Sequence, residues 1–143
     1  MKRFKSMDFR KLLTAARNIV IIGCSAEPNR TSYGIAAKLK SSGYAIMPVN
    51  PNYEEILGEK CYDDMRSVPG DIKVDIVVIF RNKAYTGQMV RSIADWSEKS
   101  GQKPVIWTQL DVSSPEAEDL ALEHDLPYVR NHCIAVEYAK NVG

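Results

Sequence analysis

The spacing of apolar residues changes repeatedly along the chain, between the continuous runs of buried strands and the three-to-four-residue period of helices. β-Branched runs stand at 19–23 and 74–80, and such runs indicate strands that are buried on both faces. Strands and helices are therefore predicted in alternation. The strands are expected at 19–23, 44–51, 74–80, 104–110 and 127–131, and the helices at 31–42, 89–100, 113–126 and 133–141.

Shorter features complete the pattern. Pro48 and Pro51 are expected to close the second strand, because proline cannot donate a hydrogen bond to a neighbouring central strand. The segment EKCY at 59–62 predicts a short edge strand, and DDMRSVPG at 63–70 predicts a brief helical turn. Near the N-terminus the helical spacing of apolar residues predicts an amphipathic helix that packs on the domain, in preference to one on a membrane surface. These residues are Phe9, Leu12, Leu13 and Ala16.

Alternating strands and helices with short connections favour parallel pairing through right-handed crossovers. The fold class that we predict is therefore α/β, with a doubly wound, mostly parallel, Rossmann-like sheet covered on both faces. A chain of 143 residues has the length of one ordinary domain. We expect an N-terminal helix within 1–17 that packs on a single domain formed by 18–143.

Composition and charge narrow the function. Apolar residues make up 45% of the chain, and its formal net charge is only +1, so no overall field attracts nucleic acid or an anionic membrane. Three separated cysteines, Cys24, Cys61 and Cys133, fit reduced thiols, and they lack the spacing of zinc ligands. Without a secretory signal or a membrane span in the sequence, the expected location is the cytoplasm.

Polar residues gather after the predicted strands, where doubly wound sheets bind their ligands. After the first strand, Gly23 permits close backbone approach, and Ser25, Thr31 and Ser32 place hydroxyl groups near the start of a helix. Exposed N–H groups and the helix dipole favour an anion at such a position. The alternative is that Thr31 or Ser32 merely caps the helix.

Basic residues strengthen the prediction of an anion site. Arg30, Arg81 and Arg130 each follow a predicted strand on the same rim, and the fixed donors of arginine suit phosphate. Lys83 could assist as a point charge. The alternative for each arginine is an ion pair with a nearby acid, and for Arg130 we favour that alternative.

The nucleotide signatures with fixed spacing are missing. Gly23 is followed by Cys24, Ser25 and Ala26 rather than by the second glycine of G-x-G-x-x-G, and the second strand ends in Asn50 rather than in an acid. No G-x-x-x-x-G-K-[ST] loop occurs either. The sequence thus argues against a standard dinucleotide site and a P-loop.

Four motifs in order resemble those of the small stand-alone CoA-binding domain proteins, which are related to the CoA-binding domains of the succinyl-CoA synthetase α subunit and of NDP-forming acyl-CoA synthetases. They are IIGCSAEPNRTSYGIAAKLKSSGYAIMPVNP, EEILGEKCYDDMRSVPGDIKVDIVVIFR, VIWTQLDV and NHCIAVEY. The resemblance extends from about Asn18 to Tyr138. Departures occur after Phe-Arg, where this chain has NKAYTG, and at Asn-His-Cys, where the family commonly has Asp-Arg-Cys.

This resemblance implies a Rossmann-type domain that binds coenzyme A or an acyl-CoA as a small-molecule nucleotide ligand. The nucleotide and pyrophosphate would lie over the first strand loop and the end of the second strand. The resemblance assigns Gly23, Cys24 and Ser25 to the loop under the ligand, and Arg30, Ser32 and Tyr33 to contacts with phosphate or ribose. It assigns Asn50 and Pro51 to the adenosine side, and Phe80 and Arg81 to the far side of the groove.

Residues suited to catalysis are few. His132 lies on the same rim, but a histidine without an orienting partner is more often structural than a general base. Cys24 stands beside a helix start, which can lower the pKa of a thiol, although small buried cysteines commonly serve packing. We therefore expect a non-catalytic binding module with no metal site. The alternatives are an NAD(P)-linked oxidoreductase, a subunit of an acyl-CoA ligase assembled with a partner chain, and an interaction protein that has lost its ligand.

Overall fold

Five parallel strands form the central sheet of the computed structural model, which describes residues 7–143. The strands lie in the order β2-β1-β5-β6-β7, so the chain first builds outward from β1 to β2 and then crosses to the other side of β1. Their bounds are β1 Asn18–Ile22, β2 Ala45–Val49, β5 Ile76–Ile79, β6 Val105–Thr108 and β7 Tyr128–Val129. This arrangement confirms the predicted α/β, Rossmann-like fold class.

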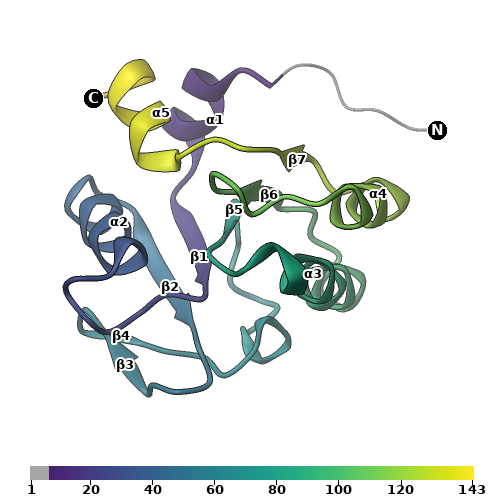
Figure 1. The fold of residues 1–143 in the computed structure, drawn as a ribbon, viewed down its shortest axis with the longest axis horizontal. Coiled ribbons are helices and arrows are strands. Elements are labelled where there is room, and N and C mark those ends of the chain that lie inside the picture. The colour runs from purple at the N-terminus through teal and green to yellow at the C-terminus, as the bar shows by residue number, and fades with distance from the viewer. Residues whose placement is uncertain (1–6) are drawn as a thin grey trace.

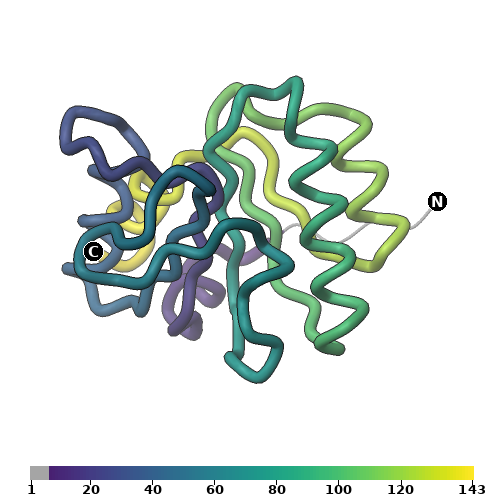
Figure 2. Tube along the Cα trace, turned by 90° about the horizontal axis from the view of Figure 1, so that it is seen from below, coloured from purple at the N-terminus to yellow at the C-terminus, as the bar shows by residue number. Residues whose placement is uncertain are grey.

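Five α-helices cover the sheet in two layers (Figure 1). They are α1 Phe9–Ala15, α2 Thr31–Ser41, α3 Thr86–Ser100, α4 Pro115–Glu123 and α5 Ile134–Asn141. Alternate side chains of a strand point to opposite faces, and Ile19 and Ile21 of β1 accordingly pack with α1, α2 and α5, whereas Val20 and Ile22 pack with α3 and α4. Figure 2 shows α3 and α4 running side by side on their face of the sheet.

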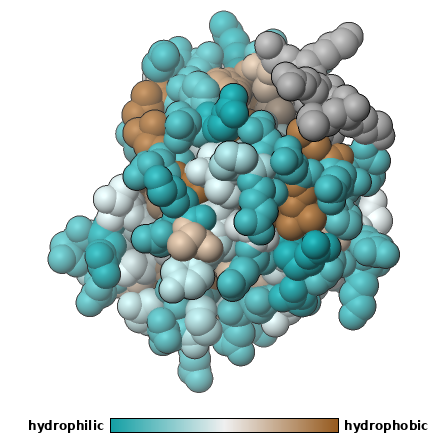
Figure 3. All heavy atoms as spheres, turned by 45° about the vertical axis from the view of Figure 1, so that its right-hand side comes forward, coloured by the Kyte–Doolittle hydropathy of each residue, from teal (hydrophilic) through white to brown (hydrophobic). Residues whose placement is uncertain are grey.

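The outer surfaces of the helices are polar. Figure 3 shows mainly hydrophilic residues on the side that carries α3 and α4, with apolar residues confined to small separate areas. Within residues 7–143 the large apolar side chains that remain exposed are Tyr85, Leu110, Val136 and Val142. No helix in this part of the chain has both the length and the apolar character that a membrane crossing needs.

The N-terminal helix lies against the last one. α1 contacts α5, and Leu13 of α1 is buried in the core on that side of the sheet. The hydroxyl of Tyr44 donates a hydrogen bond to the Leu13 carbonyl, which fixes α1 to the start of β2. The amphipathic helix is thus observed at Phe9–Ala15, and the remainder of its predicted range at 1–6 lies outside the described residues. The domain boundary at 17 stays a prediction.

The second strand differs from its prediction because it continues through Pro48 to Val49. β2 is the outermost strand on its side of the sheet, and the Val49 carbonyl accepts a hydrogen bond from the N–H of Gly23, directly after β1. Pro48, one residue earlier, therefore faces away from β1, where no N–H is needed. Its carbonyl accepts from Tyr62 N–H at 3.0 Å.

The segment after β2 forms a small hairpin. β3 Glu55–Ile56 pairs antiparallel with β4 Glu59–Lys60 through a turn in which Leu57 and Gly58 have positive φ. The predicted edge strand is thus present: Glu59 and Lys60 pair with β3, and Tyr62 at its end forms a parallel bridge with Val49 of β2. The predicted helical turn is observed as the 3-10 helix η1 Met65–Ser67.

The order of the strands reverses between β1 and β5, and the two backbones lie very close there. Gly23, directly after β1, has a φ of +81°, and a Cβ atom on it would lie 2.0 Å from the Phe80 carbonyl oxygen. Phe80 N–H in turn donates to the Ile22 carbonyl at 2.8 Å. Only glycine fits this position, because it combines a left-handed conformation with the absence of a side chain.

We predict that Gly23→Ala lowers the free energy of unfolding by about 2 kcal/mol or more, from the cost of the left-handed conformation plus the contact with Phe80. Gly34→Ala is the matched control, because a Cβ at Gly34 on α2 meets no atom within 4 Å. That change should stabilise by about 0.5–1 kcal/mol, as alanine favours helix. Urea unfolding measures both, and equal effects of the two changes would contradict the account.

Candidate functional site

An open cleft of about 1010 Å³ lies at the carboxyl ends of the strands, at the point where the strand order reverses. This is the place where doubly wound sheets bind their ligands. The lining residues come from the loops after β1, β2, β5 and β6 and from the starts of α2 and α5. They are Gly23, Ser25, Glu27, Asn29, Arg30, Thr31, Ser32, Ile35, Asn50, Asn52, Tyr53, Phe80, Arg81, Asn82, Gln109, Leu110, Val112 and Cys133.

A smaller pocket of about 130 Å³ adjoins the cleft. Gly23, Asn50 and Arg81 line both spaces. Most of the other lining residues of the smaller pocket are apolar, namely Ile22, Val49, Pro51, Met65 and Met89. The polar ones are Asp63, Asp64 and the buried Ser92. The two spaces together therefore offer an apolar recess beside a polar cleft.

The loop after β1 is held by its own hydroxyl groups. Ser25 N–H donates to Ser32 Oγ at 2.9 Å, and Ser25 Oγ accepts from Glu27 N–H at 3.0 Å. Arg30 is the N-cap residue directly before α2, and its side chain makes no capping hydrogen bond. Thr31 and Ser32 are therefore not caps, and the first turn of α2 faces the cleft with its dipole uncompensated.

Asn50 connects the loop after β1 with the turn after β2. Its Nδ2 donates to the Cys24 carbonyl at 2.9 Å, and its Oδ1 accepts from Asn52 N–H at 2.9 Å. Both ends of the amide are therefore engaged by backbone. This side chain positions the two loops, and it differs from the acid that would bind ribose hydroxyls in a standard dinucleotide site.

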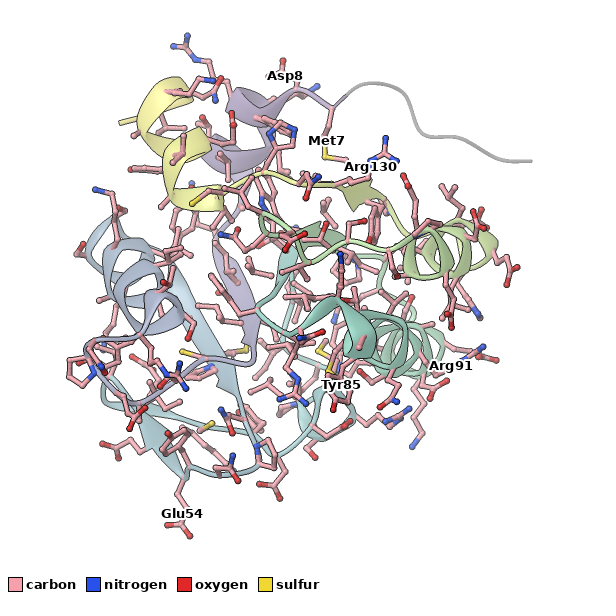
Figure 4. The ribbon with its side chains drawn as sticks, viewed as in Figure 1. Met7, Asp8, Glu54, Tyr85, Arg91 and Arg130 are labelled. Atoms are coloured by element: carbon pink, nitrogen blue, oxygen red, sulfur yellow. The ribbon has the colours of Figure 1, made fainter. Side chains whose placement is uncertain are left out.

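The basic residues of the rim differ in their partners. Arg30 lies 3.5 Å from Glu27, Lys83 lies 3.8 Å from Asp111, and Arg130 lies 3.0 Å from Glu118. The ion pair of Arg130 agrees with the interpretation favoured for it, and Figure 4 shows Arg130 well away from Tyr85 at the start of α3.

Arg81 is the exception among these cations. No carboxylate of residues 7–143 forms an ion pair with it, and its guanidinium lies over the Tyr85 ring, 5.1 Å from the centroid. Its Cδ would lie 3.2 Å from a Cβ on Gly23, so the side chain passes directly over that glycine. Arg81 thus reaches across the switch point with an uncompensated charge.

The cleft and the adjoining pocket bring together nine of the twelve predicted site residues. Three do not line either space: Cys24 is buried, Tyr33 on α2 is partly buried against the core, and Lys83 pairs with Asp111. Cys24 enters the site only through its carbonyl, which accepts from Asn50. The nine residues are Gly23, Ser25, Arg30, Thr31, Ser32, Asn50, Pro51, Phe80 and Arg81.

The loop after β6 supplies residues that the sequence analysis did not select. Gln109 is buried, and its Oε1 accepts from Ile134 N–H at 2.9 Å, which joins this loop to the start of α5. Leu110 is 64% exposed and, with Val112, makes the neighbouring end of the cleft apolar. The available signal was the W-x-Q motif, which places these residues directly after a strand.

His132 has an orienting partner that the sequence did not reveal. Its Nδ1 lies 3.1 Å from Oε2 of the buried Glu137, and its ring meets Phe9 of α1 at 4.9 Å between centroids. The ring does not line the cleft, and it links α5 to α1. The geometry agrees with a structural role for His132.

Fold and cleft together define a small Rossmann-like domain with its ligand space at the switch point of a parallel sheet. The chain belongs to the CoA binding domain family, whose model matches residues 17–139. This match confirms the resemblance on which the sequence analysis relied.

Relatives of the same size and parts of larger ligases share this similarity. The chain is 29% identical to YneT of Bacillus subtilis over 97% of its own length and 98% of YneT. It is 35% identical to an ADP-forming acetate–CoA ligase of Methanocaldococcus jannaschii, over 48% of this chain but only 10% of the ligase. Among solved structures, a Pyrococcus horikoshii protein superposes with a TM-score of 0.85 and 32% identity over all of both chains. A Thermus thermophilus protein gives 0.84 and 25%, over 94% of this chain and 99% of the other.

The pKa of the Cys24 thiol is raised, whereas a reactive cysteine has a lowered pKa. Burial, with a smaller contribution from the charge of Cys61, raises the pKa of Cys24 from 9.0 to about 12. The packing role that the sequence analysis favoured for Cys24 agrees with this buried environment, and activation of the thiol by the start of α2 does not. Cys24 serves packing at the end of β1.

The raised pKa of Cys24 predicts a loss of stability in alkaline solution. The unfolded thiol ionises near its ordinary pKa of 9.0 while the folded thiol keeps its proton to about 12, so stability is complete below pH 9 and falls as the pH rises between these values. Above pH 9 the free energy of unfolding of wild type should fall with a slope that approaches about 1.4 kcal/mol per pH unit from this group, and Cys24→Ala should lack that contribution. Urea unfolding under reducing conditions from about pH 8 to 10.5 measures it. Cys133→Ala is the control that keeps the decline, and equal pH dependence in wild type and Cys24→Ala would contradict it.

Proposed function

We propose that this chain binds coenzyme A or an acyl-CoA in the cleft and the adjoining pocket, and that it does so as a binding module without catalysis. The observation that carries the proposal is the order of chemical environments along these spaces. An apolar pocket is followed by a cationic stretch and then by a second apolar end. Coenzyme A has the same order, with adenine, phosphates and pantetheine.

The smaller pocket suits the adenine ring. Met65 and Met89 supply polarizable apolar walls beside Val49, and methionine adapts well to a flat aromatic group. Asp63 on the rim offers a carboxylate that can accept hydrogen bonds from the exocyclic amine. Pro51 closes the side on which the sequence analysis expected adenosine.

The middle of the cleft suits the pyrophosphate. The uncapped first turn of α2 presents N–H groups and the positive end of the helix dipole, next to the loop that contains Ser25. Arg30 stands at the same helix start, and its contact with Glu27 is exposed and therefore weak. A phosphate group can replace that carboxylate at little cost.

The far end of the cleft suits the pantetheine arm and a thioester. Phe80, Leu110 and Val112 give this end an apolar surface, and Cys133 lines it beside the start of α5. Coenzyme A needs only burial and a few polar contacts here, since the arm is uncharged. The cleft is open, which leaves room for an acyl group to extend toward solvent.

The proposal of binding without turnover rests on the absence of a reactive pair. Among the described residues that line the cleft there is no histidine, and His132 is engaged with Glu137 outside it. Burial keeps the Cys24 thiol protonated by raising its pKa to about 12. Glu27 and Cys133 line the cleft, but none of its described nucleophiles has a histidine within the cleft as a base.

Titration calorimetry and thermal unfolding with CoA test the proposal. Ligand at a hundredfold excess over its dissociation constant should stabilise the protein by about 2.7 kcal/mol. Arg30→Ala should weaken the affinity for CoA about tenfold, because one charge-assisted contact with phosphate is lost. Arg130→Ala removes an arginine of the same rim that is paired with Glu118, and it should leave the affinity unchanged. Absence of CoA binding at near-millimolar concentration, or equal stabilisation by NAD and ATP, would sink the proposal.

A separate measurement tests the absence of catalysis. Acetyl-CoA incubated with stoichiometric protein should release free thiol no faster than acetyl-CoA in buffer alone, as followed with a thiol-reactive dye. The control is a protein sample whose binding of acetyl-CoA has been verified by calorimetry, so that lack of release cannot reflect lack of binding. Thiol release that scales with protein concentration would contradict the non-catalytic assignment.

A further inference from the structure

Arg81 occupies the junction between the two ligand spaces. It lines both the smaller pocket and the larger cleft, and the other two residues that do so offer no charge. Gly23 has no side chain, and the amide of Asn50 is engaged at both ends by backbone. Any anionic group at this junction therefore meets Arg81 first.

The charge of Arg81 is free to act. The other cations of the rim, Arg30, Lys83 and Arg130, each have a carboxylate within 4 Å, whereas no ion pair of Arg81 exists within residues 7–143. The contact with the Tyr85 ring positions the guanidinium without neutralising its charge. Such an arginine keeps its full fork of donors for a phosphate.

In coenzyme A the ribose lies between adenine and pyrophosphate, and its 3′-hydroxyl carries a separate phosphate group. A phosphate monoester bears a charge of about −1.5 to −2 near neutral pH. With adenine in the smaller pocket and pyrophosphate at the start of α2, the ribose falls at the junction. We propose that Arg81 recognises the 3′-phosphate and thereby makes this domain select CoA over dephospho-CoA. This inference rests on the proposed function.

The acidic residues of the pocket are compatible with this assignment. Asp64 is already committed, because it accepts from Arg66 N–H at 2.8 Å and pairs with the Arg66 guanidinium at 3.3 Å. Asp63 lines the smaller pocket but not the larger cleft, so its carboxylate belongs to the side assigned to the base. The buried Ser92 hydroxyl donates to the Met89 carbonyl. Arg81 alone remains for an anion at the junction.

Calorimetry with CoA and with dephospho-CoA, at fixed ionic strength, tests the assignment on the full chain. Wild type should bind CoA about tenfold to hundredfold more tightly than dephospho-CoA. Arg81→Ala should lose that ratio, with weaker binding of CoA and little change for dephospho-CoA. Arg30→Ala should weaken both ligands by the same factor and keep the ratio. Arg130→Ala should change neither affinity.

The outcomes separate this inference from the function on which it rests. If wild type binds CoA and dephospho-CoA equally, or if Arg81→Ala weakens both by the same factor, the assignment of Arg81 is overturned while CoA binding stands. If wild type binds neither ligand, the proposed function fails as well.

The variant Arg81→Lys guards against a folding defect of the alanine variant, because it keeps the charge but lacks the forked donors of arginine. A CoA preference between those of wild type and Arg81→Ala supports the assignment. A ratio in Arg81→Lys as high as in wild type would show that the fork is not needed, and would overturn specific recognition by the guanidinium.

Discussion

The close approach of two backbones at the switch point is the constraint on which the site depends. The Phe80 carbonyl fills the space that a side chain on Gly23 would need, and Phe80 N–H is bonded to the Ile22 carbonyl. Gly23 N–H is bonded in turn to the Val49 carbonyl. Backbone hydrogen bonds of Ile22 and Gly23 thus join β1 to both of its neighbours, β5 and β2. The floor of the cleft is therefore backbone. Because that floor carries no side chain at Gly23, the stem of Arg81 can cross it.

The sequence predicts the layered fold well because burial on both faces leaves a strong signal. Runs such as 74–80 have no polar face, and in a chain that alternates with amphipathic helices such runs fit only a covered parallel sheet. The errors lie where an element is too short to show a period, or where the outcome depends on which strands are neighbours. β3 has two residues and therefore no pattern, and Pro48 is tolerated because its nitrogen lies on the side of β2 that faces away from β1. Neither fact is visible before the strand order is known.

The site is predicted less completely, since sequence places a residue on the rim without showing what its side chain is bonded to. Residues directly after strands, such as Ser25 and Arg81, do line the cleft. Cys24 follows the same strand, yet its side chain is buried in the core, and desolvation raises its pKa. His132 similarly has a partner five residues later that only the geometry of α5 reveals. The direction in which a side chain points and the partner that it contacts depend on tertiary packing, which a local sequence pattern does not show.

The balance of charge around the cleft explains how a nearly neutral protein can suit a highly anionic ligand. A formal net charge of +1 provides no long-range attraction, and fields from exposed charges are screened within about 10 Å at 0.1 M salt. Recognition must then come from charges in contact with the ligand. Exposed pairs such as Arg30–Glu27 contribute about 0–1 kcal/mol, so exchange of the carboxylate for a phosphate costs little. Arg81 has no pair to exchange, and its orientation is already set by Tyr85. In the proposed complex with CoA, this difference between a cation that must be released and one that is free of an acidic partner within residues 7–143 would give Arg30 a part in general affinity and Arg81 a part in selectivity.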